Sequence, residues 1–193
     1  MDLEHFLRDP QSRRRFFRTS AVSVAGASAV LLGACSDDTK NPVEGPDESD
    51  LADVEILNAA LDLELRGVAA YKVGAGKLRG ERLAIVKLFL EQEQAHADGL
   101  GAAIKDRDGT PNRAKNAYDF PGLRTEADVL RFAIDLENTA IAAYIDALPK
   151  LSDNDLRATA ASIITNEAEH MSVLLDALGR DPVPAAFVTG RPA

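Results

Sequence analysis

Apolar residues recur at spacings of three and four along most of the chain beyond residue 50. This is the period of an amphipathic helix. A tight turn near Gly80 and a stop at Pro149 interrupt the pattern, and residues 106–124 show no sustained period. The pattern therefore predicts an all-α four-helix bundle with helices over residues 51–77, 81–105, 125–148 and 152–178.

Two short polar motifs mark the starts of the third and fourth helices. Thr125 with Asp128, and Ser152 with Asp155, both resemble a capping box. In that motif the first side chain accepts a hydrogen bond from the backbone three residues later, and the acidic side chain reaches back. We expect Thr125 and Ser152 to cap these helices.

Six ionisable residues stand in the apolar stripes, at positions where Leu or Ala is usual. Two of the six are histidines, and each histidine follows a glutamate by three residues, so the two side chains share one helix face. A bundle that aims two such pairs inward, with one Glu from each of two other helices, forms a site for two metal ions. The predicted metal ligands are Glu64, Glu93, His96, Glu137, Glu167 and His170.

The two halves of the chain resemble each other. The segment LDLE at 61–64 is followed by AAY at 69–71, and IDLE at 134–137 is followed by AAY at 142–144. A Glu-x-x-His motif follows in each half. Within each predicted hairpin, the two glutamates are equally far from the turn, so they stand at the same height. The sequence therefore predicts a pseudo-twofold bundle with a shared site at its middle.

The connection over residues 106–124 decides how the two hairpins pack. Fully extended, it could span about 60 Å, whereas a helix of the predicted length is about 36 Å long. We therefore expect a lengthwise crossover between the second and third helices.

Buried carboxylates need compensation. Burying one unpaired carboxylate costs several kcal/mol, and four would exceed a typical net stability of roughly 5–15 kcal/mol. The stripes hold no Lys or Arg, so two divalent cations are the expected partners. Oxygen-rich ligands with one imidazole per metal favour two iron or two manganese ions, whereas zinc prefers more nitrogen or sulfur donors.

Neighbours of the ligands suggest supporting roles. Tyr71 and Tyr144, two turns beyond Glu64 and Glu137, could hydrogen-bond ligands or intercept oxidising equivalents during catalysis. They could equally be core aromatics whose hydroxyl reaches a polar partner. Gln92 and Asn166 each precede a ligand glutamate and could contact the ligands from outside. Glu91 and Glu169 lie off the ligand line, and we expect them on the solvated face.

The N-terminal residues resemble targeting signals. Arg13-Arg14 within residues 12–18 resembles a twin-arginine export motif, and the apolar run that follows is too short to cross a bilayer. Cys35, the only cysteine, ends a sequence similar to a lipobox, in which the cysteine is lipidated. The alternative is an ordinary cleaved signal with an incidental Cys35. Either way, a lone cysteine leaves no intramolecular disulfide.

The composition bears on the partners of the protein. The net charge of -9 argues against a nucleic-acid partner. The sequence leaves the oligomeric state open, and a homodimer is one alternative.

The motifs and helices together predict how the chain is divided. The expected parts are an export signal (1–34), a lipidated cysteine with a disordered acidic tether (35–49), the bundle (50–185) and a tail (186–193).

With these residues in hand, the chain resembles the ferritin-like superfamily. It is most similar to exported bacterial ferritin-like domain proteins, whose relatives include plant desiccation-related proteins. The resemblance covers about residues 50–185 and rests on the two LDLE-like segments, both Glu-x-x-His motifs and Asp119-Phe120-Pro121. It implies that Glu64 and Glu137 are terminal or bridging carboxylates, and that the Glu/His pairs serve two metals.

Two functions fit these expectations. The first is a diiron or dimanganese oxidoreductase that acts on peroxide, dioxygen or Fe(II) outside the cytoplasm, held to a membrane by lipid at Cys35. The second is a membrane-tethered module that binds metal or recruits a partner without turnover. A bare bundle without metal would leave the buried carboxylates unexplained.

Overall fold

The computed structural model describes residues 48–191 and contains four long helices and no strand in that range. This confirms the predicted all-α four-helix bundle. α3 begins at Glu48, so the last two residues of the predicted tether belong to the first helix, while the export motif and Cys35 lie outside the described residues. The helices are α3 (Glu48–Ala75), α4 (Gly80–Lys105), α5 (Glu126–Ala147) and α6 (Asn154–Ala177), with the short 3-10 helix η1 (Leu148–Lys150) after α5.

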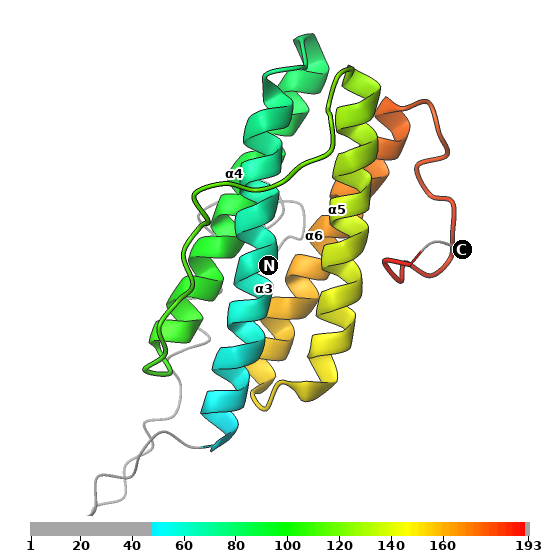
Figure 1. The fold of residues 1–193 in the computed structure, drawn as a ribbon. Helices are drawn as coiled ribbons and strands as arrows, with labels where there is room; N and C mark the ends of the chain where they lie inside the picture. The colour runs from blue at the N-terminus through cyan, green and yellow to red at the C-terminus, as the bar shows by residue number, and fades with distance from the viewer. Residues whose placement is uncertain (1–47, 192–193) are drawn as a thin grey trace, which may run out of the picture. The chain divides into compact units, whose positions relative to one another are not determined.

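The helices form two antiparallel hairpins, α3 with α4 and α5 with α6, joined by a long crossover. The chain between Lys105 and Glu126 returns along the bundle from the end of α4 to the start of α5 (Figure 1). Asn58 fastens this crossover to α3, because its Nδ2 donates to the Thr110 carbonyl at 3.2 Å and its Oδ1 accepts from the Asn112 amide at 2.7 Å. The lengthwise crossover expected from the sequence is present.

The helix caps agree with the sequence in one case and differ in the other. Thr125 Oγ1 accepts from the Asp128 amide at 3.1 Å, and Asp128 Oδ2 accepts from the Thr125 amide at 2.9 Å, which is the predicted capping box. The prediction that Ser152 caps α6 is wrong, because the cap is Asp153. Ser152 instead donates its amide and its hydroxyl to Asp53 of α3, at 2.9 and 2.6 Å. Asp53 is fully buried, and these two donors compensate its desolvation.

Two apolar clusters fill the bundle on either side of a polar layer. One cluster contains Tyr144 and the other contains Tyr71. The carboxylates and imidazoles of the polar layer are therefore enclosed along the bundle axis by side chains that exclude water. The first cluster includes Leu57, Leu61, Leu100, Ile104, Leu156 and Ile163, and the second includes Leu78, Val86, Phe89, Leu130, Ile134 and Leu174. Within residues 48–191, no helix combines the length and the apolar character needed to cross a membrane.

Candidate metal centre

All four helices contribute to one buried polar cluster. Each of the four predicted glutamate ligands is at most 4% exposed, and His170 is 1% exposed. His96 is the most accessible, with 14% of its side chain exposed. The structure thus brings together the six predicted ligands: Glu64 from α3, Glu93 and His96 from α4, Glu137 from α5, and Glu167 and His170 from α6.

The six residues form two overlapping groups of potential metal ligands. In each group, one ligand atom from every residue lies within 4.8 Å of the others. Glu93 and Glu167 belong to both groups, so they have the position of bridging carboxylates. Glu64 with His96 completes one group, and Glu137 with His170 completes the other. If each group held one ion, Glu64 and Glu137 would be terminal ligands, which is one of the two roles that the sequence left open.

Both imidazoles turn Nδ1 toward the carboxylates. His96 Nδ1 lies 3.4 Å from Glu64 Oε2 and 3.1 Å from Glu167 Oε1. His170 Nδ1 lies 3.1 Å from Glu167 Oε2 and 3.4 Å from oxygens of both Glu93 and Glu137. Glu167 therefore stands between the two histidines, with one oxygen toward each.

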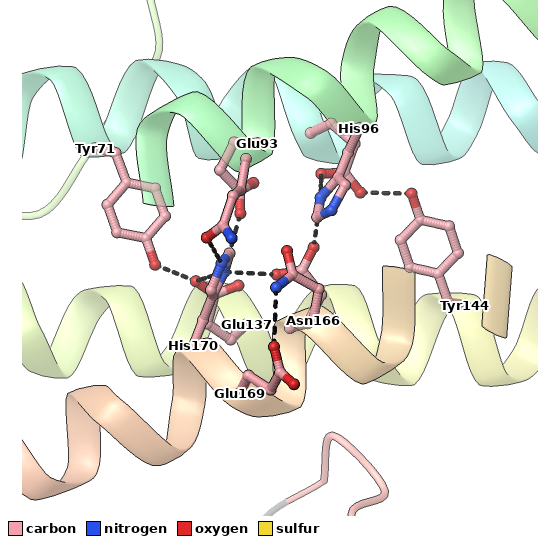
Figure 2. A network of polar contacts seen from close by, with 11 residues as sticks. Tyr71, Glu93, His96, Glu137, Tyr144, Asn166, Glu169 and His170 are labelled. Carbon is pink, nitrogen blue, oxygen red and sulfur yellow. Dashed lines mark hydrogen bonds and ion pairs between the residues drawn. The ribbon is translucent and has the colours of Figure 1, made fainter. Parts of the chain in front are cut away.

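The two predicted tyrosines flank the cluster along the bundle, and their hydroxyls point inward (Figure 2). Tyr71 on α3 donates to Glu137 Oε1 on α5. Tyr144 on α5 donates to Glu64 Oε1 on α3 at 2.5 Å. Each tyrosine is thus a core aromatic and also a hydrogen-bond donor to a ligand glutamate, which combines two of the interpretations offered by the sequence.

The two histidines differ in their surroundings. His170 Nε2 lies 2.8 Å from Gln92 Oε1, and its ring stacks on Phe89 with centroids 4.0 Å apart. A donor bond from Nε2 to Gln92 would leave the Nδ1 lone pair facing the carboxylates. Asn166, the equivalent of Gln92 in the repeat, instead donates to the exposed Glu169 at 3.3 Å.

Comparisons with known proteins agree with this fold. A profile of the ferritin-like domain family matches residues 52–180. The chain belongs to the ferritin-like domain family. A solved structure of a conserved hypothetical protein from Mycobacterium tuberculosis is similar, with a TM-score of 0.63 and 22% identity over 66% of this chain and 97% of that chain. At this identity the likeness shows the fold alone. The comparison with curated proteins finds no match.

Burial and mutual repulsion govern protonation in the polar cluster of this ferritin-like domain. Burial raises the pKa of Glu93 to about 8 and holds that of Glu137 well above its usual range. Burial also acts to raise the pKa of Glu167, but the contacts from His170 and His96 outweigh it and lower that pKa to about 2.

The same contacts act on the histidines in the opposite direction. Burial acts to lower both pKa values, yet the facing carboxylates outweigh it. They raise the pKa of His96 to about 10 and that of His170 to about 11. Without cations, the ferritin-like domain therefore keeps protons on its imidazoles to balance the carboxylates.

The cluster fits metal ions by its donor set and by its unsatisfied atoms. Within residues 48–191, no ion pair joins a Lys or Arg to any of the four glutamates. Buried polar atoms are costly unless they are paired. A pair of cations at the centre would satisfy the buried atoms that lack a hydrogen-bond partner there: Glu64 Oε2, Glu93 Oε1, both oxygens of Glu167, and Nδ1 of His96 and of His170.

A narrow opening between α3 and α5 reaches this cluster. Three ligand glutamates line it, together with Arg66 and Gly67 of α3 and Thr139 and Ala140 of α5. Its volume of about 10 Å³ is close to the least that holds one water molecule. A larger cavity of about 190 Å³ beside the same helices is lined by Tyr144, Asp146, Lys150 and aliphatic side chains, and by none of the six candidate ligands.

Proposed function

We propose that this ferritin-like domain binds two iron or two manganese ions and acts as an oxidoreductase on peroxide, dioxygen or Fe(II). The observation that carries the proposal is the pair of overlapping ligand groups that share Glu93 and Glu167. Four carboxylates match the charge of two divalent cations and leave both imidazoles neutral. Ligation that is rich in oxygen, with one imidazole per metal, favours iron or manganese by ligand hardness.

Bound together at this site, two redox-active ions would supply or accept the two electrons of a peroxide. The chain's own residues provide the setting for that chemistry. Tyr144 holds Glu64 Oε1 and leaves Oε2 toward His96, whereas Tyr71 holds Glu137 Oε1, the same oxygen that lies 3.4 Å from His170 Nδ1. The apolar clusters on both sides keep bulk water from the cluster, which strengthens electrostatic interactions inside it.

The size of the opening supports small reactants. With room for about one water molecule, the opening between α3 and α5 suits an ion, dioxygen or a peroxide rather than an organic substrate. Arg66 lies at this opening and adds a positive charge beside the acidic cluster.

The test is metal content followed by reaction with oxidant. Protein folded in the cell would be analysed for elements, reduced, and mixed with peroxide or dioxygen in a stopped-flow spectrometer. About two irons or manganese per chain with repeated oxidation and reduction would support the enzyme. Two ions that do not react would support a metal-binding module without turnover. Absence of metal, also after reconstitution with Fe(II) or Mn(II), would contradict both.

We also propose that the protein works outside the cytoplasm, tethered by lipid at Cys35. This rests on the twin-arginine and lipobox motifs of residues 1–35, which lie outside the described residues. Twin-arginine export moves folded proteins, so the cytoplasm could load the site before export. Loading there would keep the site from copper and zinc, which bind nitrogen and oxygen ligands more tightly than iron or manganese.

A further inference from the structure

Glu93 and Glu167 belong to both ligand groups, yet their carboxylates are held differently. Glu167 turns one oxygen to each histidine, at 3.1 Å in both cases. Glu93 contacts His170 through Oε1 at 3.4 Å. Its Oε2 lies against the backbone of α3 at Gly67, where a Cβ atom would overlap it and would stand 3.2 Å from Glu93 Cδ. The carboxylate thus occupies the space that a side chain at residue 67 would take.

The internal repeat shows that the space left by the missing side chain of Gly67 occurs on α3 and not at the equivalent position of α5. Gly67 follows Glu64 by three residues, as Ala140 follows Glu137. Both residues line the opening between α3 and α5, so at this pair of equivalent positions α5 presents a methyl group and α3 presents only backbone. Glycine inside a helix destabilises it relative to alanine. Gly67 is buried in the interior of α3, so its presence calls for a compensating reason.

We propose that Gly67 is a positioning residue for Glu93. The missing side chain allows the Glu93 carboxylate to keep Oε1 toward His170 while Oε2 lies at the opening. A divalent cation that enters between α3 and α5 would meet this oxygen beside the other glutamates that line the passage. The inference rests on the proposed function of the cluster as a metal site.

The substitution Gly67→Ala tests this role, with Gly99→Ala as its matched control. Gly99 lies in the interior of α4, and no atom lies within 4 Å of a Cβ added there. Both changes add one methyl group to a helix and favour helix formation equally, but only Gly67→Ala meets the carboxylate. The readouts are calorimetric titration of the metal-free full chain with Mn(II) and the melting temperature of that metal-free chain.

We expect wild type and Gly99→Ala to bind two Mn(II) ions with the same affinity. Gly67→Ala should weaken at least one of the two affinities about 10- to 100-fold, the range seen when groups that orient a ligand are changed. Its metal-free melting temperature should not fall, since the carboxylate can move aside when no ion holds it. Wild-type affinity and stoichiometry in Gly67→Ala would overturn the positioning role and leave the metal site standing. If wild-type protein does not bind Mn(II), both the positioning role of Gly67 and the proposed metal site are overturned.

A second substitution, Glu93→Asp, tests whether the effect of Gly67→Ala acts through the Glu93 carboxylate or through other contacts between α3 and α4. Glu93→Asp shortens the side chain by one methylene and withdraws its oxygens from α3. The affinity loss caused by Gly67→Ala should shrink to less than about threefold in the Glu93→Asp background, as expected for coupled neighbours. If Gly67→Ala alone fails to fold, Glu93→Asp should restore folding. An undiminished loss, or a double variant that also fails to fold, would overturn the proposal.

Discussion

Tyr71 of α3 donates its hydroxyl hydrogen to Glu137 of α5, the helix that the internal repeat makes equivalent to α3. In the equivalent hydrogen bond, the Tyr144 hydroxyl of α5 donates to Glu64 of α3 at 2.5 Å. Each half of the repeat thus supplies the donor for the glutamate of the other half. Burial and the facing glutamate raise the pKa of both tyrosines, so both hydroxyls stay protonated and remain donors.

Removing one of these hydroxyls tests whether the tyrosines orient the ligands. Tyr71→Phe and Tyr144→Phe keep the ring in the core but leave a glutamate oxygen without its donor. We expect each change to weaken Mn(II) binding about 10- to 100-fold, measured by calorimetric titration. Tyr118→Phe is the matched control, since Tyr118 stacks on Phe120 at 5.9 Å and contacts none of the ligands. Unchanged Mn(II) affinity in both variants would show that Tyr71 and Tyr144 only pack in the core and do not orient the glutamates.

The shared glutamates give a prediction about metal stoichiometry. Glu93 and Glu167 occur in both ligand groups, whereas Glu64 occurs in one. The double change Glu93→Ala with Glu167→Ala should abolish binding of both metals while the helices persist. Glu64→Ala should leave about one metal per chain.

Elemental analysis and far-ultraviolet circular dichroism would check these outcomes together. The matched control is Glu91→Ala with Glu169→Ala, because both residues are exposed on the same two helices and belong to neither group. That control should keep two metals. Two metals in the Glu93→Ala and Glu167→Ala variant would refute the assignment of the bridging ligands.

The gathering of the six candidate ligands at one place in the bundle could be predicted because the signal is repeated and periodic. Glu64 and Glu137 interrupt apolar stripes at equivalent positions of two similar segments, and each histidine follows its glutamate by three residues. Spacing on a helix determines which face a residue occupies. The fold followed from the same periodicity, and the crossover followed from the length of the connection.

Other features depend on side-chain directions that spacing does not specify. Asp53 stands four residues before Leu57 in the stripe of α3, so the sequence does contain a signal for a buried carboxylate at this core position. The local motif at Ser152 predicts a helix cap, because a local motif does not reveal a buried acceptor on a distant helix. The contact of Gly67 with Glu93 was not foreseeable, since it requires the rotamer of Glu93.

Asp53 yields a prediction about stability that is independent of metal. Its carboxylate accepts two hydrogen bonds from Ser152 and ties α3 to the turn before α6. Asp53→Ala should lower the free energy of unfolding by about 2–3 kcal/mol, because the two hydrogen bonds between Ser152 and the buried carboxylate are lost. Urea denaturation of metal-free protein measures this, and Glu55→Ala, an exposed change on the same helix, should have an effect of less than about 0.5 kcal/mol. Equal effects of the two changes would contradict the role given to Asp53.

The lipid anchor proposed at Cys35 can be tested in cells. Cys35→Ala removes the only thiol available for lipidation. We expect the protein to move from the membrane fraction to the soluble exported fraction, as measured by fractionation and immunoblotting. A change of Arg13 and Arg14 to Lys should instead block export and leave the protein in the cytoplasm. Membrane retention of the Cys35→Ala variant would count against the lipobox.

The perturbed pKa values predict opposite pH behaviour for metal-free and metal-loaded protein. In the folded metal-free chain, burial raises the pKa of Glu93 from 4.5 to about 8, and carboxylates raise that of His96 from 6.5 to about 10 despite its burial. His170 is raised likewise, to about 11. The folded state therefore binds more protons than the unfolded state between about pH 5 and pH 10, so its stability falls as pH rises. Glu167, with a pKa lowered to about 2, adds no slope in this window.

Metal binding should remove this pH dependence, because ligand carboxylates and imidazoles must lose their protons to bind. We expect the melting temperature of chelator-treated protein to decrease steadily from about pH 5.5 to about pH 9. With Mn(II) in excess it should stay level or rise, so that the stabilisation by metal grows with pH. Glu93→Gln should reduce the slope of the metal-free curve between about pH 5 and pH 8, since Glu93 titrates there, while Glu137 and the two histidines keep the remainder of the slope. A metal-free curve that rises with pH would show that the imidazoles are not held protonated by the carboxylates, and the electrostatic case for two cations at this site would fail with it.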